Sequence, residues 1–447
     1  MSYFVVRFGG NRIPEDQFIL RFPSLLETDK GTKIVVVSAH AAIAETISGA
    51  IIRVIHTKPD LIAIEAGLNG TFSEITGNKP STPYLNSVHA LIKLLRGIHL
   101  TGDYSPALKD QVLSFSEILT AELLHERLRL AGIPAKTIRP DEIGLEVTSD
   151  FGSATYTGLE KEKISQFDTG SVLILPGSSG ITASGKIARA GVSAADYTAA
   201  AITAFLNVPA LVLWGIDKPF LNADPRIVDG ALQINRLTYS EASELAYFDH
   251  YSFHPRTVEL LEPDHIPIRI YNSDLLKPET IINTETFVTE QIVKSVACSD
   301  DISVLKLDGP GVGLKPGILA RVTTCLHEAG INIRSVITSQ VSINFILGRG
   351  CSGKALELVN QLGFTSVKNI TAETGVSLIG VIGHGMQHHY GVFAKVFTAA
   401  ANGKVNILLS GSGASDLSGY LIVSSADRDQ CVREIHHAFF NNQTITV

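Results

Sequence analysis

Cysteine is scarce in this sequence, and no two cysteines form a CxxC pair. The 447 residues contain four cysteines, two methionines and one tryptophan. Without a CxxC pair, neither a zinc site nor a disulfide framework is predicted. The four are Cys298, Cys325, Cys351 and Cys431.

Positive charge and long apolar stretches are also limited. The formal net charge is −7 and Lys and Arg form no run, which argues against nonspecific nucleic-acid binding. The N-terminal MSYFVVRFGG lacks the basic and apolar regions of a signal peptide and predicts a strand. The alanine-rich stretch 194–214 is interrupted by Asp196, Asn207 and Pro209, so we expect no membrane span there. These absences predict a soluble cytoplasmic protein.

Three histidines gather in HGMQHHY (384–390), but no cysteine or carboxylate beside them completes a set of metal ligands. We therefore interpret them as solvated loop residues and predict no metal ligands in the chain.

Apolar residues are plentiful, at 45% of the chain against 18% charged residues, which allows two or three domains with a large core. The runs 33–39, 171–177 and 210–217 lack polar alternation. This is typical of strands covered on both faces, as in a parallel sheet with crossover helices. Ser38 and Gly177 fall at the carboxyl ends of two such strands, where open α/β sheets bind ligands. The polar GNKPSTPY (77–84) predicts an exposed loop.

The pattern changes near residue 300. SVLKLDG, a helix over 316–329 and INIRSVITSQVSINFIL give strand, helix, strand, strand, and a similar unit follows from VSLIGVIG to HHAFF. Two units of roughly 70 residues each predict duplicated βαββαβ modules.

The opening VVRFGG has two interpretations. Gly9 and Gly10 would let backbone N–H groups approach phosphate oxygens, and Arg7 would neutralise their charge. The alternative is a plain turn at the end of a strand.

Carboxylates at two further places suggest a polar site. On a helix over 114–124, Glu117 shares a face with leucines, so its charge needs either a ligand ammonium or an internal ion pair. Asp196 begins a helix, where it would cap the helix or orient a substrate. The turn Asp224-Pro225-Arg226 carries a cation that would face a nucleotide or form a surface ion pair.

Taken in order, these segments resemble the aspartokinases over nearly the whole chain. VVRFGG is similar to that family's KFGG turn, LSFSEILTAELL to its SxGExLS helix, and TSDFGSA to its TDxxFGxA turn. SAADYTAAAI, LNADPRIV and SEASELAYFDHYSFHPRT are similar to GGSDYTAALI, YTADPRIV and EAxELAxFGAKVLHPRT. The C-terminal units look like the family's paired ACT modules.

The resemblance implies an α/β fold, an amino-acid kinase α/β/α sandwich on a mainly parallel sheet with two βαββαβ (ferredoxin-like) ACT modules. It implies a kinase domain over 1–284 and an inserted ACT module over 300–372. The second ACT module would combine 285–299 with 373–447.

The implied reaction is phosphorylation of the L-aspartate β-carboxylate by ATP with Mg²⁺, the first step in lysine, threonine and methionine synthesis. By resemblance, Ser38, Glu117 and Asp196 would bind aspartate, and Arg7 and Asp196 would act in catalysis. The nucleotide side would comprise Gly9, Gly10, Asp217, Lys218 and Arg226.

Several family positions are altered. The first-loop lysine is Arg7, the second lysine is Tyr251, and the arginine that grips the substrate is Val192. Losing one preorganised charge stabiliser typically costs ~10²–10³ in rate. Lys186, Arg189 and Lys218 lie near the altered motifs and are candidate substitutes. Further replacements are Asn11, Arg12, Ala44, Ser193, Ala194, Ala195, Gly215 and Ile216.

Three functions are therefore compatible with the sequence. The first is an aspartokinase, the second an impaired homologue that regulates through its ACT modules, and the third a kinase for another small carboxylate.

The ACT modules imply a homodimer or a dimer of dimers with amino-acid effectors. Acidic residues that hold lysine in lysine-inhibited relatives correspond to Arg334 and Gln340, which favours a neutral effector such as threonine. The alternative is a vestigial site. The candidate effector residues are Gly317, Ile318, Arg334, Ser339 and Gln340.

Overall fold

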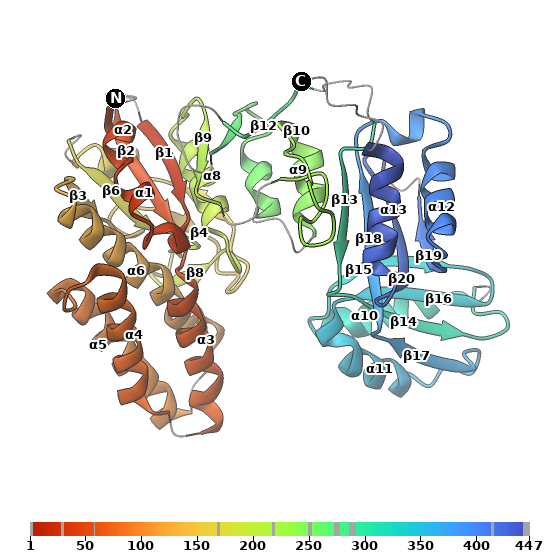
Figure 1. Ribbon diagram of the computed structural model, residues 1–447. Coiled ribbons are helices and arrows are strands. Elements are labelled where there is room, and N and C mark those ends of the chain that lie inside the picture. Colours follow the sequence, from red (N-terminus) through yellow and green to blue (C-terminus); the bar gives the residue numbers. More distant parts are fainter. Residues whose placement is uncertain are drawn as a thin grey trace, which may run out of the picture. The chain divides into compact units, whose positions relative to one another are not determined.

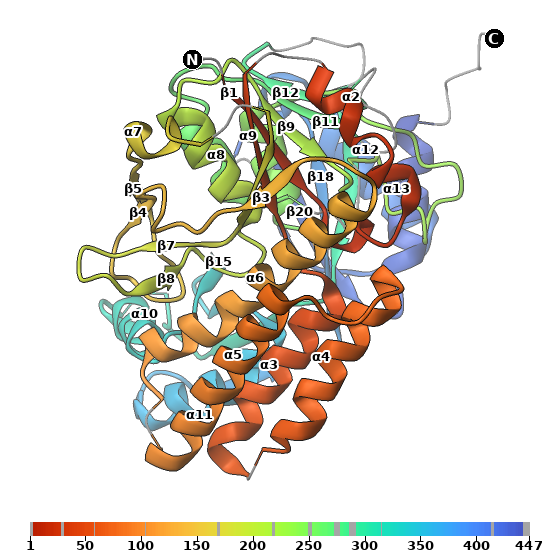
Figure 2. The same cartoon turned by 90° about the vertical axis from the view of Figure 1, so that its left-hand side faces the viewer.

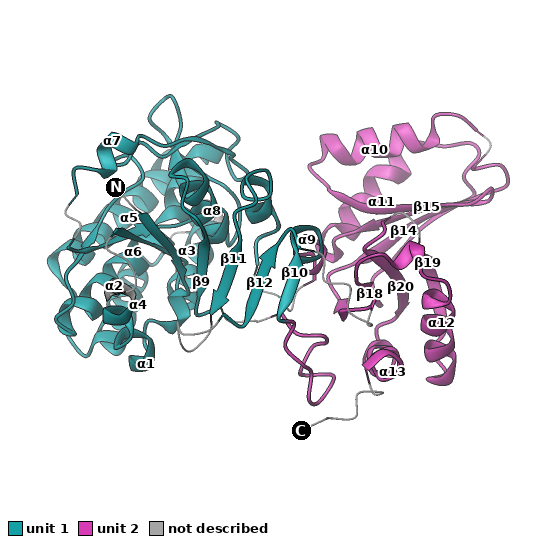
Figure 3. Ribbon diagram, turned by 90° about the horizontal axis from the view of Figure 1, so that it is seen from above, with its two compact units in different colours: residues 1–219, 235–243, 252–285 teal, residues 220–234, 244–251, 286–447 magenta. Residues whose placement is uncertain are grey.

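The structure is a computed structural model that divides into two compact units, coloured separately in Figure 3. Unit 1 comprises 1–219, 235–243 and 252–285, and unit 2 comprises 220–234, 244–251 and 286–447. The structure describes residues 3–27, 31–57, 59–102, 104–167, 170–216, 220–248, 253–271, 278–285, 292–313, 315–412 and 415–440.

Unit 1 is built on an eight-stranded sheet with the order β10-β12-β11-β9-β1-β2-β6-β3 (Figure 1). All neighbouring strands are parallel except β11 and β12. The mainly parallel sheet predicted from the sequence is thus confirmed. Its strands are β1 (Tyr3–Phe8), β2 (Thr32–Val37), β3 (Ala135–Thr137), β6 (Val172–Pro176), β9 (Leu211–Trp214), β10 (Arg236–Thr238), β11 (Ile268–Tyr271) and β12 (Thr280–Asn283).

Helices cover both faces of this sheet, and the strands alternate their side chains between them. Val6, Phe8, Val35 and Val37 belong to the core shared with α3, α4, α5 and α6. The intervening residues of β1 and β2 face away from that core, and α8 packs on these strands. The result is an α/β/α sandwich. These helices are α3 (Ala41–His56), α4 (Leu61–Thr76), α5 (Thr82–Thr101), α6 (Pro106–Leu130) and α8 (Ala195–Phe205).

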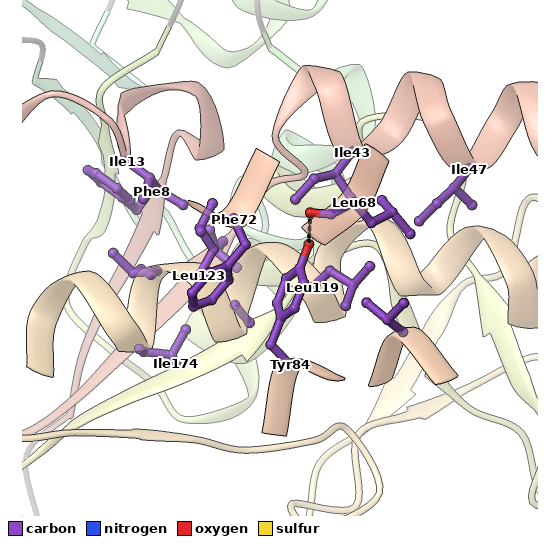
Figure 4. Close-up of a cluster of buried hydrophobic side chains, with 14 of the residues drawn as sticks. Phe8, Ile13, Ile43, Ile47, Leu68, Phe72, Tyr84, Leu119, Leu123 and Ile174 are labelled. Atoms are coloured by element: carbon purple, nitrogen blue, oxygen red, sulfur yellow. Dashed lines mark hydrogen bonds between the residues drawn. The ribbon is translucent and has the colours of Figure 1, made fainter. Parts of the chain in front are cut away.

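The four helices α3 to α6 lie side by side below the sheet in Figure 2. Figure 4 shows their core, in which Phe72 packs against Tyr84 and the Tyr84 hydroxyl donates to Leu68 O at 2.8 Å. The exposed loop expected over 77–84 is wrong at its end, because α5 begins at Thr82 and Tyr84 is fully buried.

A second, smaller sheet in unit 1 has the order β5-β4-β7-β8. Its strands are β4 (Glu146–Val147), β5 (Tyr156–Gly158), β7 (Ser179–Ile181) and β8 (Ile187–Arg189). The short helices of the two units are η1 (Gly10–Arg12), α1 (Asp16–Ile19), α2 (Phe22–Glu27), α7 (Lys161–Ile164), α9 (Tyr239–Ala246), η2 (Pro255–Leu260), η3 (Arg349–Cys351) and η4 (Met386–His388).

Unit 2 contains two antiparallel four-stranded sheets of the same design, as expected for paired βαββαβ modules. One has the order β15-β16-β14-β17 and carries α10 (Ile318–Glu328) and α11 (Ser352–Gln361). The other has the order β13-β18-β20-β19 and carries α12 (Val392–Asn402) and α13 (Arg428–Phe440). The strands are β13 (Ser295–Ser299), β14 (Ser303–Asp308), β15 (Ile333–Thr338), β16 (Ser342–Leu347), β17 (Asn369–Glu373), β18 (Val376–Ile382), β19 (Ile407–Gly411) and β20 (Ser418–Ser424).

The second of these sheets takes its outer strand from before the first module in the sequence. β13 pairs with β18, with Ser295 opposite Ile382 and Ser299 opposite Leu378. β14 and β17, at the two ends of the intervening module, also pair with each other, with Val304 opposite Glu373.

Within the described residues, no helix is long and apolar enough to cross a membrane.

Candidate functional site

The carboxyl ends of β1, β2, β6 and β9 meet at one edge of the large sheet, because these strands are parallel neighbours. The loops that follow extend the ladder. Gly9 N donates to Trp214 O at 3.1 Å, Ser38 N to Phe8 O at 3.1 Å, and Gly177 N to Val37 O at 3.0 Å. Ser38 and Gly177 therefore lie at the carboxyl ends of neighbouring strands, and ligand binding at this edge remains a prediction.

Close backbone contacts at this edge require glycine at positions 9 and 10. A Cβ on Gly9 would lie 2.1 Å from Gly215 O, and one on Gly10 would lie 2.1 Å from Ser38 O. Gly10 N also donates to Ser38 Oγ at 3.0 Å. Both glycine N–H groups are thus engaged within the protein, and neither is presented to a phosphate as the sequence interpretation expected.

Arg7 and Asp196 form a buried ion pair. Arg7 Nε lies 2.7 Å from Asp196 Oδ1, and their side chains are 10% and 2% exposed. This contact lacks hydrogen-bond alignment, and Arg7 Nη1 has no hydrogen-bond partner among the described residues. His254 N donates to Asp196 Oδ2 at 3.2 Å. Asp196 lies in the first turn of α8 but does not cap it, because the cap residue Ala194 has no side-chain hydrogen bond and Asp196 faces Arg7 instead.

Glu117 and Arg189 form a second buried pair. Arg189 Nη2 donates to Glu117 Oε1 at 2.8 Å, with side-chain exposures of 11% and 3%. Burial raises the pKa of Glu117, and the Arg189 guanidinium opposes that rise. Glu117 Oε2 and Arg189 Nε make no hydrogen bond within the described part of the chain. Of the two sequence interpretations of Glu117, the structure has the internal ion pair.

Asp110 fixes the strand that carries Arg189. Its Oδ2 accepts from Arg189 N at 2.8 Å and from Gly152 N at 2.7 Å, and the residue is 2% exposed. The arginine is therefore held at the site by its backbone as well as by its side chain.

Loop and helix hydrogen bonds bring the predicted residues to the same edge. His40 N donates to Thr120 Oγ1 at 3.0 Å, which joins the loop after Ser38 to α6 one turn beyond Glu117. Ser178 N donates to Thr198 Oγ1 at 2.7 Å, which joins the loop after β6 to the start of α8. That Ser38, Glu117 and Asp196 line a single pocket remains a prediction.

Arg256 connects the start of α8 to the loop before β5 by hydrogen bonds. It donates to Ala154 O at 3.2 Å, to Thr155 Oγ1 at 2.8 Å and to the Tyr197 hydroxyl at 3.0 Å. Tyr197 stacks on His254, with ring centroids 5.8 Å apart. Asp110, Thr120 and Arg256 were not identified from the sequence, although Thr120 and Arg256 lie inside motifs that were.

The remaining nucleotide candidates are Arg226, Asp217 and Lys218. Arg226 belongs to unit 2, where it donates to Asp224 and its side chain is 76% exposed. Asp217, Lys218 and Tyr251 lie outside the described residues. Val192, at the position of the family's arginine, is 86% exposed.

The candidate effector residues fall at two ends of one ACT sheet. Gly317 (φ 88°) caps α10 and Ile318 is buried, while Ser339 and Gln340 form the turn after β15, where Gly313 N donates to Gln340 O at 3.0 Å. Arg334 lies at a register shift near the start of β15. Ser339 is five positions further along the chain, which corresponds to about 16 Å in an extended strand.

The sequence comparisons agree with this architecture. Residues 2–272 match the sequence model of the Amino acid kinase family, and residues 379–439 match that of an ACT domain. The chain belongs to the amino acid kinase family. Within this family it groups with the aspartokinases.

The similar proteins are aspartokinases from plants and bacteria. The chain is 28% identical over 373 residues to Aspartokinase 2, chloroplastic, of Arabidopsis thaliana, covering 79% of this chain and 68% of that protein. It is 27% identical over 374 residues to Aspartokinase 3, chloroplastic, of the same plant, covering 80% and 66%. The chain thus spans about two thirds of the length of these relatives.

Solved structures share the fold. E. coli aspartokinase III in complex with aspartate and ADP superposes with a TM-score of 0.80 at 22% identity, covering 98% of this chain and 100% of that chain. Clostridium acetobutylicum aspartate kinase gives a TM-score of 0.74 at 20% identity, with the same coverage. Identities this low establish the fold alone.

Proposed function

We propose that the protein is an aspartokinase-type phosphotransferase. A β-carboxylate oxygen of L-aspartate attacks the γ-phosphorus of ATP, the bond to the β,γ-bridging oxygen breaks, and ADP leaves. The observation that carries this proposal is the pair of buried arginine–carboxylate contacts at the carboxyl edge of the sheet. Three of the four residues, Arg7, Glu117 and Asp196, lie in segments that resemble aspartokinase motifs, which supports the proposal.

The acceptor side fits an amino acid. Glu117 Oε2 is buried without a partner among the described residues, so it is suited to accept from a substrate ammonium. Arg189 Nε lacks a partner too, and a planar guanidinium suits a carboxylate. Arg189 would therefore bind the α-carboxylate in place of the arginine that Val192 replaces. Ser38 would complete this side from the neighbouring loop.

The donor side fits the nucleotide less fully. Arg7 offers a buried guanidinium with an unpartnered Nη1, oriented by Asp196, which would stabilise charge on the transferring phosphoryl group. Gly9 and Gly10 would line the phosphates through close backbone approach and not as N–H donors. ATP supplies the phosphoryl group, and Mg²⁺ would be held mainly by its phosphates.

The domain and partner predictions extend this proposal. A kinase domain over 1–284, an inserted module over 300–372 and a second module from 285–299 and 373–447 are supported by the β13–β18 pairing. The segments 220–234 and 244–251 group with unit 2 and qualify the first boundary. A cytoplasmic homodimer with a neutral amino-acid effector completes the proposed assembly.

One alternative has an observation in its favour. Both site arginines and both loop glycines are already engaged by protein atoms. A regulatory homologue that binds an amino acid through its ACT modules without phosphorylating it would not need these glycine N–H groups for a phosphate.

An assay of ADP release and of acyl-hydroxamate formation with an amino-acid panel separates these functions. The proposal expects aspartate- and ATP-dependent hydroxamate that Asp196→Asn lowers by ~10²-fold or more. Asp141→Asn, at an exposed carboxylate paired with Arg139, serves as the matched control. The aspartokinase reaction would be rejected if another carboxylate were phosphorylated and aspartate were not, or if no amino acid were phosphorylated.

A further inference from the structure

Ser178 has a strained backbone in the turn that follows β6. Its φ is 65°, in the left-handed region that residues other than glycine rarely adopt. Two hydrogen bonds hold this backbone in place, since Ser178 N donates to Thr198 Oγ1 at 2.7 Å and Ser178 O accepts from Ala190 N at 2.9 Å. Strain of this kind persists only where the surroundings over-determine it, and it is concentrated at functional sites.

The close packing of the turn explains why the strain is retained. A Cβ on Gly177 would lie 2.6 Å from Ala195 Cβ, so the turn lies directly on the first residue of α8. The Thr198 hydroxyl that accepts from Ser178 N also lies 2.6 Å from the Tyr156 hydroxyl. The start of α8 therefore fixes the backbone of Ser178, and relaxing its φ would move the side chain.

The Ser178 hydroxyl is buried in the same place. The residue is 1% exposed, and Oγ has no well-aligned hydrogen-bond partner within the described part of the chain. A buried hydroxyl without a partner destabilises the folded protein. Without a ligand, both the backbone conformation and the hydroxyl of Ser178 are therefore unfavourable.

Ser178 lies beside the buried pair of Glu117 and Arg189. Ser179 is paired with Arg189 between β7 and β8, so Ser178 adjoins the strand that carries the guanidinium. Burial raises the pKa of Glu117, and the Ser178 hydroxyl is near enough to this carboxyl to oppose the rise, after the larger effect of Arg189. Glu117 Oε2 has no hydrogen-bond partner among the described residues. A hydroxyl and a carboxylate oxygen are thus both available in one buried place.

We infer that Ser178 is a substrate-binding residue that selects acceptors carrying a free ammonium group. Its O–H donates to the Glu117 carboxylate while a lone pair on Oγ accepts from the ammonium, because a hydroxyl can donate and accept at once. The ammonium is then held between two oxygens, and Arg189 remains for the α-carboxylate. This inference rests on the proposed function, since it concerns the same acceptor site.

Two variants separate the hydroxyl from the strain. Ser178→Ala removes the hydroxyl and keeps the left-handed conformation, whereas Ser178→Gly removes both. Each should raise the KM for aspartate about 10-fold or more, the loss expected for one hydrogen bond to a charged group, with a smaller change in the KM for ATP. In thermal unfolding without ligands, Ser178→Gly should melt above the wild type, because glycine adopts this φ without strain.

Succinate, which is aspartate without its ammonium, tests the contact itself. As a competitor of aspartate it should have nearly the same inhibition constant in the wild type and in Ser178→Ala, since it lacks the group that the hydroxyl binds. His265→Gly relieves a similar φ of 55° at an exposed residue of the same unit and should change neither KM. Equal KM for aspartate in Ser178→Ala and the wild type, or equal weakening of aspartate and succinate, would overturn the inference and leave Ser178 as a structural residue.

Failure of the proposed function would be seen in the wild type and not in the variants. If the wild type phosphorylates no amino acid, calorimetric titration with aspartate in the absence of ATP replaces the kinetics. The inference then expects aspartate to bind the wild type about 10-fold more tightly than it binds Ser178→Ala. Equal affinities, or no measurable binding of aspartate by the wild type, would contradict it.

Discussion

Arg189 is the residue on which the proposed acceptor specificity depends. Replacing it with glutamine keeps a donor for Glu117 but removes the cation, so the apparent KM for aspartate should rise about 10–100-fold with a smaller change in the KM for ATP. Steady-state kinetics with each substrate varied in turn measures the two KM values separately.

β-Alanine, which is aspartate without its α-carboxylate, provides the internal control. Its inhibition constant should be nearly the same in the wild type and in Arg189→Gln, since it lacks the group that Arg189 binds. Lys186→Gln changes an exposed cation in the same segment and should alter neither constant. Equal weakening of aspartate and β-alanine would mean that Arg189 is only structural.

Protonation of His254 should make the stability of the folded protein depend on pH. Burial lowers its pKa, with Asp196 opposing, so in the folded protein the ring resists protonation. The unfolded chain binds that proton below about pH 6.5, and stability is therefore lost as the pH falls from there toward the lower folded pKa. In His254→Gln, the fall in melting temperature between about pH 7.5 and pH 5.5 should be smaller than in the wild type.

His436 has its pKa lowered in the same direction, so some acid sensitivity should persist in His254→Gln. The exposed His89, changed to glutamine, gives the control and should retain the wild-type slope. An unchanged slope in His254→Gln would contradict the assignment.

At this scale the sequence located residues but not their partners. Helical periodicity placed Glu117 among leucines and showed that its charge needed compensation. Its partner Arg189 is 72 residues away on a short strand, and which side chain arrives there depends on long-range strand register. For the same reason the ion pair of Arg7 with Asp196 could not be predicted from local pattern.

Among the elements, the turn after β1 has the tightest backbone packing at the site. Gly9→Ala places a methyl 2.1 Å from Gly215 O, and Gly10→Ala places one 2.1 Å from Ser38 O. Each should lower the free energy of unfolding by about 3 kcal/mol, and Gly10→Ala should also displace Ser38. Chemical denaturation of the variants measures the change.

Two glycines of α4 supply the opposite expectation. A Cβ on Gly67 or Gly70 meets no atom within 4 Å, so alanine there should stabilise the helix by up to about 1 kcal/mol each. Destabilisation by all four substitutions would show that close packing is not what sets the two pairs apart.

Element prediction succeeded where burial on both faces left a continuous apolar run, as in β2, β6 and β9. It failed over 82–84, because the proline and polar residues there form the first turn of a helix and not a loop. Burial of Tyr84 comes from its packing on Phe72 and its bond to Leu68 O, neither of which the local sequence reveals.

For the whole molecule, we expect a homodimer of twice 48.0 kDa through the ACT modules. Leu319 and Val341 in the 300–372 module are 42% and 60% exposed, so both apolar side chains are available to an interface. The double variant Leu319→Glu/Val341→Glu should sediment as a monomer at micromolar concentration. Leu100→Glu, at a 76% exposed position on α5, should not change the mass.

The pairing of β14 with β17 also determines the order in which the strands of unit 2 pair during folding. β13 and β18 meet across the intervening module, and closing a loop of that length in a disordered chain carries an entropic cost that rises with its logarithm. Once Val304 lies opposite Glu373, the same two strands are joined by a compact unit and the cost largely disappears. During refolding, amide protons of β14 and β16 should therefore become protected from pulsed deuterium exchange before those of β13 and β18. On the ribosome, β13 is made before the intervening module and would pair with β18 only after that module has been made.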